Sequence, residues 1–298
     1  MDFNGIVRGI KEIKIQGAIN VAKAAVKGIG LVEKEYKSKD RDVLLEILYK
    51  AKDVLINTRP TEPCMRNALN YIFTHIGNEE DIATAVDKRI KEIDNHFSDA
   101  SEKIAKFGTK KIVNKSVVFT HCHSNAVIAI FREAKKQRKN FTVHNTETRP
   151  LFQGRITAKE VVRAGIPVRH FIDSAARIAL KHADLMLIGA DAITSEGKVI
   201  NKIGSELFAE IAEKWDVPVY CCTDSWKFDP KTVFGYEEEI EKRGAREVWA
   251  ESPKGVIVDN SIFEKINPDL ISGVISELGV YKPEIFVEEV KRTYPFLF

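Results

Sequence analysis

The chain has 298 residues, with 46 lysines and arginines against 43 aspartates and glutamates and a formal net charge of +3. This near balance excludes the strongly positive surface of a duplex-binding protein, so we expect no nucleic-acid partner. A hydrophobic content of 44% over this length can fill one large domain or two ordinary domains. No apolar run is long enough to span a membrane, and charges interrupt the N-terminus where a signal peptide is apolar. We therefore predict a cytoplasmic protein with no membrane partner.

The first part of the chain has the apolar spacing of helices. Between Asp81 and Phe107, apolar residues recur at steps of three and four, which predicts one long amphipathic helix. Three further helices are predicted to pack against it, over residues 6–29, 43–55 and 62–76, the last with Thr61 as a candidate N-cap. We predict a helical domain over residues 1–110.

The pattern changes after Lys115, where short apolar runs alternate with amphipathic stretches such as 124–138 and 155–164. The runs are VVFTH (117–121), FTVHN (141–145), VRHFID (168–173), LMLIGAD (185–191), VPVYCCTD (217–224), GVIVD (255–259) and LISGVIS (270–276). Runs that are apolar on both faces and alternate with helices predict a mainly parallel sheet that is covered on both sides. The fold class is therefore α/β, with a helical domain followed by a Rossmann-like domain over residues 111–298.

Polar side chains follow several of these runs. Ligands of parallel sheets bind beyond the carboxyl ends of the strands, so these side chains are expected to converge on one rim. They are Cys122, Ser124, the stretch Thr146 to Arg149, Asp173, Ser174, Asp191, Asp224 and Lys227. A thiol can transfer a proton or attack as a thiolate, and a buried aspartate can act as an acid.

Each candidate also has a purely structural interpretation. A free cysteine is usually a buried core residue, and Asp191 could cap a helix or a turn. Cys122 stands out because it lies just beyond a strand, where the amides of a following helix would lower its pKa. Cys221 and Cys222 lie inside an apolar run and are predicted to pack in the core. Four histidines show no recognisable spacing to a partner residue: His75, His96, His170 and His182. We predict that they lie at the surface or have their hydrogen bonds satisfied within the protein.

Metal and cofactor sites are not indicated. The four cysteines are Cys64, Cys122, Cys221 and Cys222, and no two of them form a Cys-x-x-Cys pattern. This spacing argues against a zinc ribbon or a disulfide scaffold. Consecutive side chains at His121, Cys122 and His123 would point in opposite directions and could not chelate one ion. The glycine-rich dinucleotide pattern, the Walker A pattern and the Gly-x-Ser-x-Gly elbow are absent from the sequence. We predict a reaction without a cofactor or metal.

Six ordered motifs resemble those of the sugar-phosphate isomerases related to translation initiation factor 2B. They are Thr58-Arg59-Pro60-Thr61, Thr120-His121-Cys122-His123-Ser124, Thr146-Glu147-Thr148-Arg149-Pro150 with Gln153-Gly154, Asp173-Ser174-Ala175-Ala176, Gly189-Ala190-Asp191 and Asn201-Lys202-Ile203-Gly204. The resemblance runs from about Ile13 to Gly279. It implies that Cys122 and Asp191 form the catalytic pair, which the non-catalytic regulatory relatives commonly lack.

Two enzyme branches of this family fit the motifs: ribose 1,5-bisphosphate isomerase, which serves the salvage of nucleotides such as AMP, and methylthioribose 1-phosphate isomerase. The segment Trp226 to Pro230 looks closer to the bisphosphate enzyme. Gln16 stands before Gly17 and Ala18 where the enzymes have an arginine that contacts a substrate phosphate, so a bidentate contact is lost there. A regulatory-subunit-like protein that binds a sugar phosphate or nucleotide is the alternative.

The chemistry of such an isomerase can be assigned to residues. Asp191 would protonate the ring oxygen of the sugar, and Cys122 as a thiolate would then move the C2 proton to C1. The substrate is expected to lie against Gln16, Gly17, Ala18, Arg59, Ser124, Arg149, Asn201, Lys202 and Lys227. Among these, Arg59, Arg149 and Lys227 are the cations for phosphate, and Lys227 is predicted to read the 5-position.

The C-terminal runs and the aromatic residues Phe286, Tyr294, Phe296 and Phe298 supply more apolar surface than a sheet edge alone would cover. This predicts a homo-oligomer, either a dimer or dimers built into a hexamer. Whether a nucleotide activates the protein is left open by the sequence.

Overall fold

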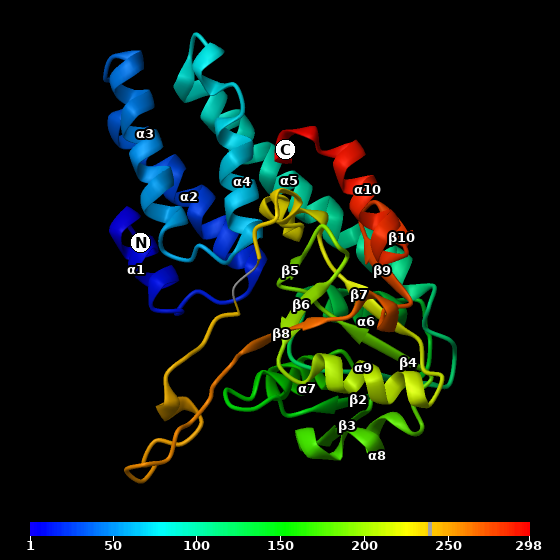
Figure 1. Cartoon of the computed structure of the whole chain (residues 1–298). Helices are drawn as coiled ribbons and strands as arrows, with labels where there is room; N and C mark the ends of the chain where they lie inside the picture. Colours follow the sequence, from blue (N-terminus) through cyan, green and yellow to red (C-terminus); the bar gives the residue numbers. More distant parts are fainter. Residues whose placement is uncertain (238–239) are drawn as a thin grey trace.

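The computed structural model describes residues 1–237 and 240–298, and it places a bundle of helices beside a layered α/β domain (Figure 1). The N-terminal helices are α1 (Phe3–Lys11), α2 (Ala18–Tyr36), α3 (Arg41–Ile56), α4 (Pro63–Phe73) and α5 (Ile82–Thr109). The long helix predicted from the apolar stripe is confirmed. Asp81 caps it, because its side chain accepts a hydrogen bond from the amide of Thr84.

Two details of the predicted helices are wrong. The single helix expected over 6–29 is divided, because the chain leaves α1 after Lys11 and starts α2 only after Gly17, whose φ of 85° suits glycine. Thr61 is not the N-cap of α4: that helix follows Glu62 and begins with Pro63. Proline fits the first helical position because its fixed φ is helical and its missing amide is not needed there.

The α/β domain is built on a seven-stranded sheet in the order β10-β9-β7-β4-β1-β2-β3. The strands are β1 (Ser116–Thr120), β2 (Phe141–Thr146), β3 (Val168–Phe171), β4 (Leu185–Ile188), β7 (Val219–Cys222), β9 (Gly273–Ser276) and β10 (Gly279–Tyr281). All neighbouring pairs are parallel except β9 with β10. The predicted parallel sheet is confirmed. The strand order reverses between β1 and β4, and such a switch point is where ligands of these sheets bind.

Helices cover both faces of this sheet, as the apolar runs predict. One face packs against α6 (Asn125–Lys136), α7 (Gln153–Arg163) and the C-terminal part of α5; the other packs against α8 (Ala176–Leu180), α9 (Ser205–Lys214) and α10 (Pro283–Thr293). Cys221 and Cys222 lie in these cores with no exposed surface, as predicted. None of the described helices is long and apolar enough to cross a membrane.

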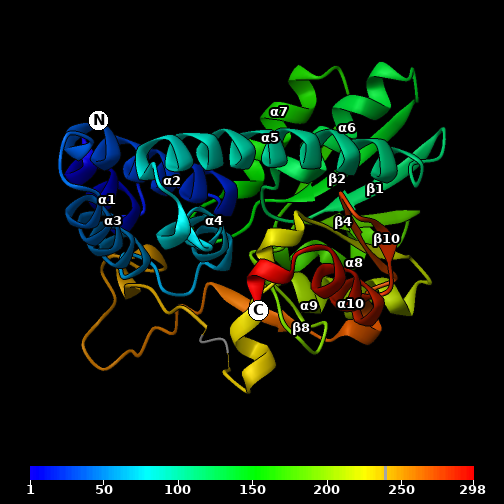
Figure 2. The same cartoon turned by 90° about the horizontal axis from the view of Figure 1, so that it is seen from above.

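Helix α5 joins the two parts of the molecule. Seen from above, it runs from the helical bundle onto the sheet (Figure 2). Its residue Phe97 belongs to the core of the bundle, whereas Ile104 belongs to a core of the sheet. The division into domains at residue 110 stays a prediction.

The run GVIVD does not form a strand, which corrects the prediction for residues 255–259. It lies in a segment from about residue 240 to 262 that projects away from the body of the molecule (Figure 1), and Ile257 is 95% exposed. After this segment, β8 (Phe263–Ile266) pairs with β6 (Val199–Lys202) and β6 with β5 (Ala192–Ile193) in a small antiparallel sheet. The sequence pattern did not indicate this second sheet.

The C-terminal aromatic residues pack mainly within their own chain. Phe286 is fully buried, and Tyr294 and Phe296 pack against the core clusters, while Phe298 remains 46% exposed. The apolar surface that was expected to drive association through these residues is therefore largely covered. The run GVIVD, the other part of that prediction, stays exposed at Val256 and Ile257, and the homo-oligomer stays a prediction.

Candidate active site

A cavity of about 290 Å³ opens between the helical bundle and the carboxyl edge of the sheet, at the switch point between β1 and β4. The predicted residues that line it are Gln16, Gly17, Ala18, Arg59, Cys122, Ser124, Asp191, Asn201, Lys202 and Lys227. These residues come from the start of α2, the loop after α3, the end of strand β6 and the segments after β1, β4 and β7. Strand ends and helix starts that are far apart in the sequence therefore share one site.

Cys122 lies two residues beyond β1 in a left-handed conformation with φ of 65°. Its amide donates a hydrogen bond to the hydroxyl oxygen of Thr148 at 3.0 Å, which fixes the turn. Burial raises the pKa of the Cys122 thiol to about 11, and the Lys202 ammonium opposes that rise. The expected lowering by helix amides is wrong, because α6 starts only at Asn125 and desolvation dominates. The thiol is mainly protonated at neutral pH, and its thiolate is a strong base.

The histidines on either side of Cys122 face different partners. The ring of His121 contacts the Thr146 hydroxyl at 2.6 Å and the carbonyl oxygen of Ile203 at 3.0 Å. The carbonyl can only accept, so that nitrogen carries the proton; burial lowers the pKa of His121 to about 4 and keeps the ring neutral. His123 contacts Thr157 instead at 3.0 Å. The rings of His121 and His123 therefore lie in separate hydrogen-bonded environments.

Asp191 lies in the loop between β4 and β5, half-buried, and its amide donates to the carbonyl oxygen of Ile200 at 2.8 Å. The loop approaches the β1 loop closely at Gly189. A Cβ atom added to Gly189 would lie 2.8 Å from the side chain of Ser124, so only glycine permits this contact without a shift. Ser124 also serves as the N-cap of α6. The two loops that carry Cys122 and Asp191 are thus packed together.

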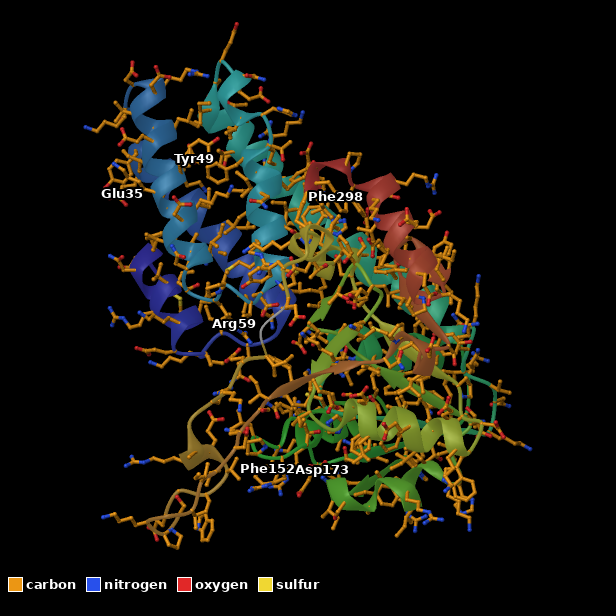
Figure 3. The ribbon with its side chains drawn as sticks, viewed as in Figure 1. Glu35, Tyr49, Arg59, Phe152, Asp173 and Phe298 are labelled. Atoms are coloured by element: carbon orange, nitrogen blue, oxygen red, sulfur yellow. The ribbon has the colours of Figure 1, made fainter. Side chains whose placement is uncertain are left out.

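The cations of the cavity already have partners within the protein. Arg59, at the base of the helical bundle (Figure 3), pairs with Glu62 at 3.2 Å and with Glu241 at 3.3 Å. Lys202 is buried and lies over the ring of Phe263, with 4.9 Å between its ammonium and the ring centroid. Lys202 also follows Asn201, whose amide group donates to the hydroxyl oxygen of Ser205. An anionic ligand would meet positive charge that is held in place before it binds.

Among the residues predicted to contact the substrate, Arg149 alone does not line the cavity; of the wider set expected at the rim, Thr146 to Thr148, Asp173 and Ser174 do not line it either. Its backbone amide and that of Thr148 donate to Asp173, which holds the turn after β2. The exposed guanidinium points away, donating to the carbonyl oxygen of Val248 and lying over the ring of Phe152. Figure 3 shows Phe152 and Asp173 together at this turn. Arg149 is therefore a surface residue that contacts the projecting segment, and its role as a phosphate ligand stays a prediction.

Two charged groups near the site were missed. Arg243 lines the cavity from the projecting segment, where no periodic pattern indicated a position for it. Glu62 is buried beside Arg59, and burial raises its pKa to about 7 although Arg59 opposes the rise. The only sequence signal for Glu62 was a charged residue directly after the motif Thr58 to Thr61. Sequence motifs identified the ends of regular strands better than residues from irregular segments.

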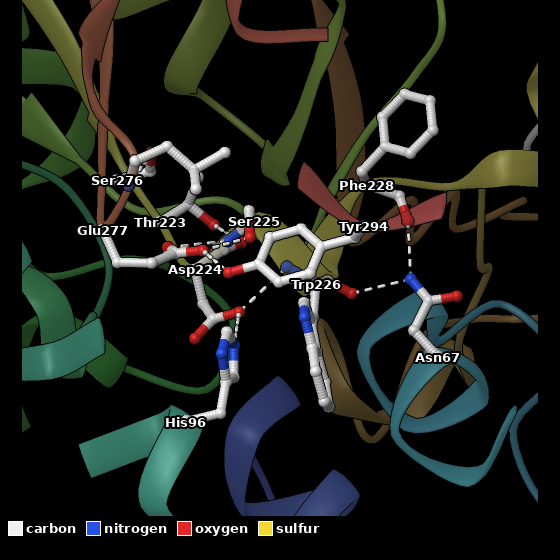
Figure 4. A network of polar contacts seen from close by, with 11 residues as sticks. Asn67, His96, Thr223, Asp224, Ser225, Trp226, Phe228, Ser276, Glu277 and Tyr294 are labelled. Atoms are coloured by element: carbon white, nitrogen blue, oxygen red, sulfur yellow. Dashed lines mark hydrogen bonds and ion pairs between the residues drawn. The ribbon is translucent and has the colours of Figure 1, made fainter. Parts of the chain in front are cut away.

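A second polar cluster adjoins the cavity at Asp224, which meets His96 of α5 and Glu277 (Figure 4). Their ligand-type atoms lie within 4.8 Å of one another, so this is a candidate place for a cation among the described residues. Both carboxylate oxygens of Glu277 accept hydrogen bonds, from Ser225 and Tyr294, and Oδ1 of Asp224 accepts one from the Trp226 amide, whereas the buried Oδ2 of Asp224 has no hydrogen-bond partner in the described part of the chain. His96 is thus a satisfied internal residue, and the cluster is organised as a hydrogen-bond network.

The state of the Cys122 thiol gives a direct prediction. Alkylation of Cys122 by iodoacetamide should accelerate with rising pH to a midpoint near pH 11, because burial raises this pKa. In Lys202→Met the reaction should be slower at any pH below that midpoint, since the cation that stabilises the thiolate is gone. Mass spectrometry of the Cys122 peptide measures the rate, and the other three cysteines, which are fully buried, serve as internal controls. A midpoint near the ordinary thiol pKa in both proteins would contradict this assignment.

A Rossmann-like sheet with a thiol and a carboxylate at its switch point, in a cavity lined by cations, is the arrangement of an acid–base site for an anionic ligand. The sequence model of the initiation factor 2 subunit family matches residues 14–283, so the chain belongs to that family.

Its similarity to individual proteins extends over nearly the whole chain. Ribose 1,5-bisphosphate isomerase of Pyrococcus furiosus is 35% identical, with 98% of this chain and 94% of that protein covered. Methylthioribose-1-phosphate isomerase of Thermoanaerobacter sp. is 33% identical, with 92% and 86% covered. The crystal structure of translation initiation factor eIF-2B from Pyrococcus horikoshii OT3 superposes with a TM-score of 0.83 at 24% identity, covering 96% of this chain and 98% of that one. The last likeness establishes the fold.

Proposed function

We propose that this protein is an aldose–ketose isomerase that converts ribose 1,5-bisphosphate to ribulose 1,5-bisphosphate. The observation that carries the proposal is that Cys122 and Asp191 both line one cavity, on loops joined by the contact of Gly189 with Ser124. The relative of 35% identity acts, by its name, on the same substrate. Such a reaction would serve nucleotide salvage, since it consumes a phosphorylated ribose.

The first step of the reaction must open the sugar ring. In a sugar 1-phosphate the anomeric oxygen is esterified, so the ring cannot open to a free aldehyde. Asp191 donates a proton to the ring oxygen, the bond from C1 to that oxygen breaks, and C1 becomes cation-like. A carboxyl in the half-buried position of Asp191 can reach a ligand in the cavity that it lines.

The second step moves a proton from C2 to C1. The Cys122 thiolate removes the C2 proton, which leaves an enol between C1 and C2. The resulting thiol returns that proton to C1, while the proton of the C2 hydroxyl goes to the Asp191 carboxylate, which restores both groups. A thiol pKa of about 11 makes the thiolate scarce but strongly basic, and Lys202 stabilises it. Closure of the cavity against water would protect the cation-like intermediate.

Two alternative functions are each favoured by specific observations. The thioether substrate of methylthioribose-1-phosphate isomerase is favoured by the 33% identical relative. A non-catalytic role, binding a sugar phosphate or nucleotide as the regulatory subunits would, is favoured by Gln16, which supplies no positive charge at the cavity, and by the fold shared with initiation factor eIF-2B. The presence of both Cys122 and Asp191 favours the enzyme over that role.

The proposed activity is tested by incubating purified protein with ribose 1,5-bisphosphate and following the phosphorus NMR spectrum. Conversion to ribulose 1,5-bisphosphate supports the proposal; conversion of methylthioribose 1-phosphate alone would transfer the protein to the other isomerase branch. Parallel samples with AMP test whether a nucleotide activates the reaction. No conversion of either sugar phosphate would favour the binding role.

We also propose that the protein works as a homo-oligomer in the cytoplasm. The four cysteines are unpaired, which suits a reducing compartment. With the C-terminal aromatics largely covered, the projecting segment offers the exposed apolar surface, since Trp249 is 50% and Ile257 95% exposed. Sedimentation at micromolar concentration is expected to show a dimer or a hexamer; a sole species of 33.6 kDa would contradict association.

A further inference from the structure

Lys227 enters the cavity from a short segment that follows β7. The segment turns through a single 3-10 helix, Ser225–Lys227, and places the Lys227 ammonium 2.6 Å from the carbonyl oxygen of Ala190. Ala190 directly precedes Asp191. One of the three ammonium hydrogens is used in this contact, which leaves the others for a phosphate. The geometry of this segment therefore sets where a substrate phosphate can lie relative to Asp191.

Asn67 of α4 holds this segment on both sides of Lys227. Its side-chain amide donates to the carbonyl oxygen of Trp226 at 2.8 Å and to that of Phe228 at 2.7 Å (Figure 4). Asn67 has no exposed surface. The nitrogen of the amide must face these two atoms, because an oxygen could not donate to either carbonyl. The two N–H donors of the buried Asn67 amide thus bind the carbonyl groups on either side of Lys227.

The neighbouring residues restrict the same segment. The His96 ring lies 3.1 Å from Asp224 and stacks on Trp226 with 4.1 Å between ring centroids. Asp224 in turn accepts the amide hydrogen of Trp226 at 2.9 Å. These contacts hold the start of the segment, before Lys227. Asn67 is the side chain that holds the residues on both sides of Lys227. The N-terminal helices, which carry no proposed catalytic group, therefore position a cation of the site.

We propose that Asn67 is a positioning residue that fixes the Lys227 ammonium for a phosphate of the substrate. The inference rests on the proposed function in one respect, namely that the ligand carries a phosphate at Lys227. Without the Asn67 amide, two buried carbonyl oxygens lose a donor, and the segment relaxes to find others. A displacement of about 1 Å at a substrate-positioning group can cost about 10²-fold in rate, so Asn67 affects kcat/KM without touching the substrate.

A double-mutant cycle separates this role from general stability. Asn67→Ala is expected to lower kcat/KM for ribose 1,5-bisphosphate by about tenfold or more, mainly through KM. In a Lys227→Met background the same change should have an effect of about twofold or less, because the group that Asn67 positions is already gone. Asn70→Ala, the same substitution on the same helix, and Leu48→Ala, which opens the core of the bundle on α3, are the controls. Neither should show coupling to Lys227.

A second measurement does not depend on activity. Reductive methylation with carbon-13 gives each lysine a methyl resonance, and Lys227→Met identifies that of Lys227. The resonance should shift in Asn67→Ala and stay in place in Leu48→Ala, even when both variants lose similar thermal stability. Equal losses of kcat/KM in both backgrounds, or an unmoved resonance, would overturn the inference. If the wild-type protein converts neither sugar phosphate, the proposed function fails, and the resonance alone decides whether Asn67 positions Lys227.

Discussion

Replacing Cys122 with serine should reduce isomerisation by about 10²-fold or more while the protein remains folded. The side chain changes little in volume, but a serine hydroxyl is a much weaker acid than a thiol and cannot supply the base that removes the C2 proton. Cys122 is only half-buried on a loop, so its replacement leaves the cores of the sheet unchanged. Initial rates with ribose 1,5-bisphosphate and thermal unfolding curves measure the two effects separately.

The matched comparisons for Cys122→Ser are made at Asp191 and at the core cysteines. Asp191→Asn should cause a loss of similar size, because the amide keeps the volume but has no acidic proton to donate. Cys222→Ser should instead lower stability and leave the chemistry unchanged, since Cys222 is fully buried in the core of the sheet. Near-normal activity of Cys122→Ser in a folded protein would show that the base has been assigned to the wrong residue.

The parts of the fold that could be predicted are those in which one physical pattern dominates. The strands β1, β2, β4 and β7 are buried on both faces, so their apolar runs are nearly continuous and bounded by polar turns. The stripe of α5 is regular over its whole length because the helix packs first on the bundle and then on the sheet. The ends of parallel strands meet at one edge of the sheet, and for this reason the sequence could predict that Cys122 and Asp191 lie close together.

Other features depend on contacts that no local pattern records. Ile13 and Ile15 continue the helical spacing of the first segment, yet the chain turns there and Ile15 packs against Gly9, to whose carbonyl oxygen its amide donates. The run GVIVD looks like a strand but has no neighbouring strand to pair with in the described structure. Arg149 stands in a family motif, but the turn held by Asp173 directs it outward. The pKa of Cys122 depends on burial by the whole cavity wall, which sequence spacing does not contain.

Lys227→Met should change which sugar phosphate the protein prefers. A bisphosphate site must neutralise a second dianion, whereas a thioether at the same position needs an apolar wall. Lys227 lines the cavity, and its ammonium is held on Ala190, beside Asp191, with donors to spare. If it binds the 5-phosphate, its loss should cost roughly 2 to 5 kcal/mol in transition-state binding of ribose 1,5-bisphosphate. Methylthioribose 1-phosphate, which has no charge at that position, should be turned over as well as before or better.

We compare the ratio of the two specificity constants between the wild type and Lys227→Met. This ratio tests whether Lys227 binds the 5-phosphate, because losses of activity common to both substrates cancel. Arg59 gives no such contrast: it is already paired with Glu62 and Glu241, so its replacement would disturb buried carboxylates with either substrate. An unchanged ratio would mean that Lys227 does not read the 5-position. A wild-type preference for the thioether would assign the protein to the methylthioribose branch.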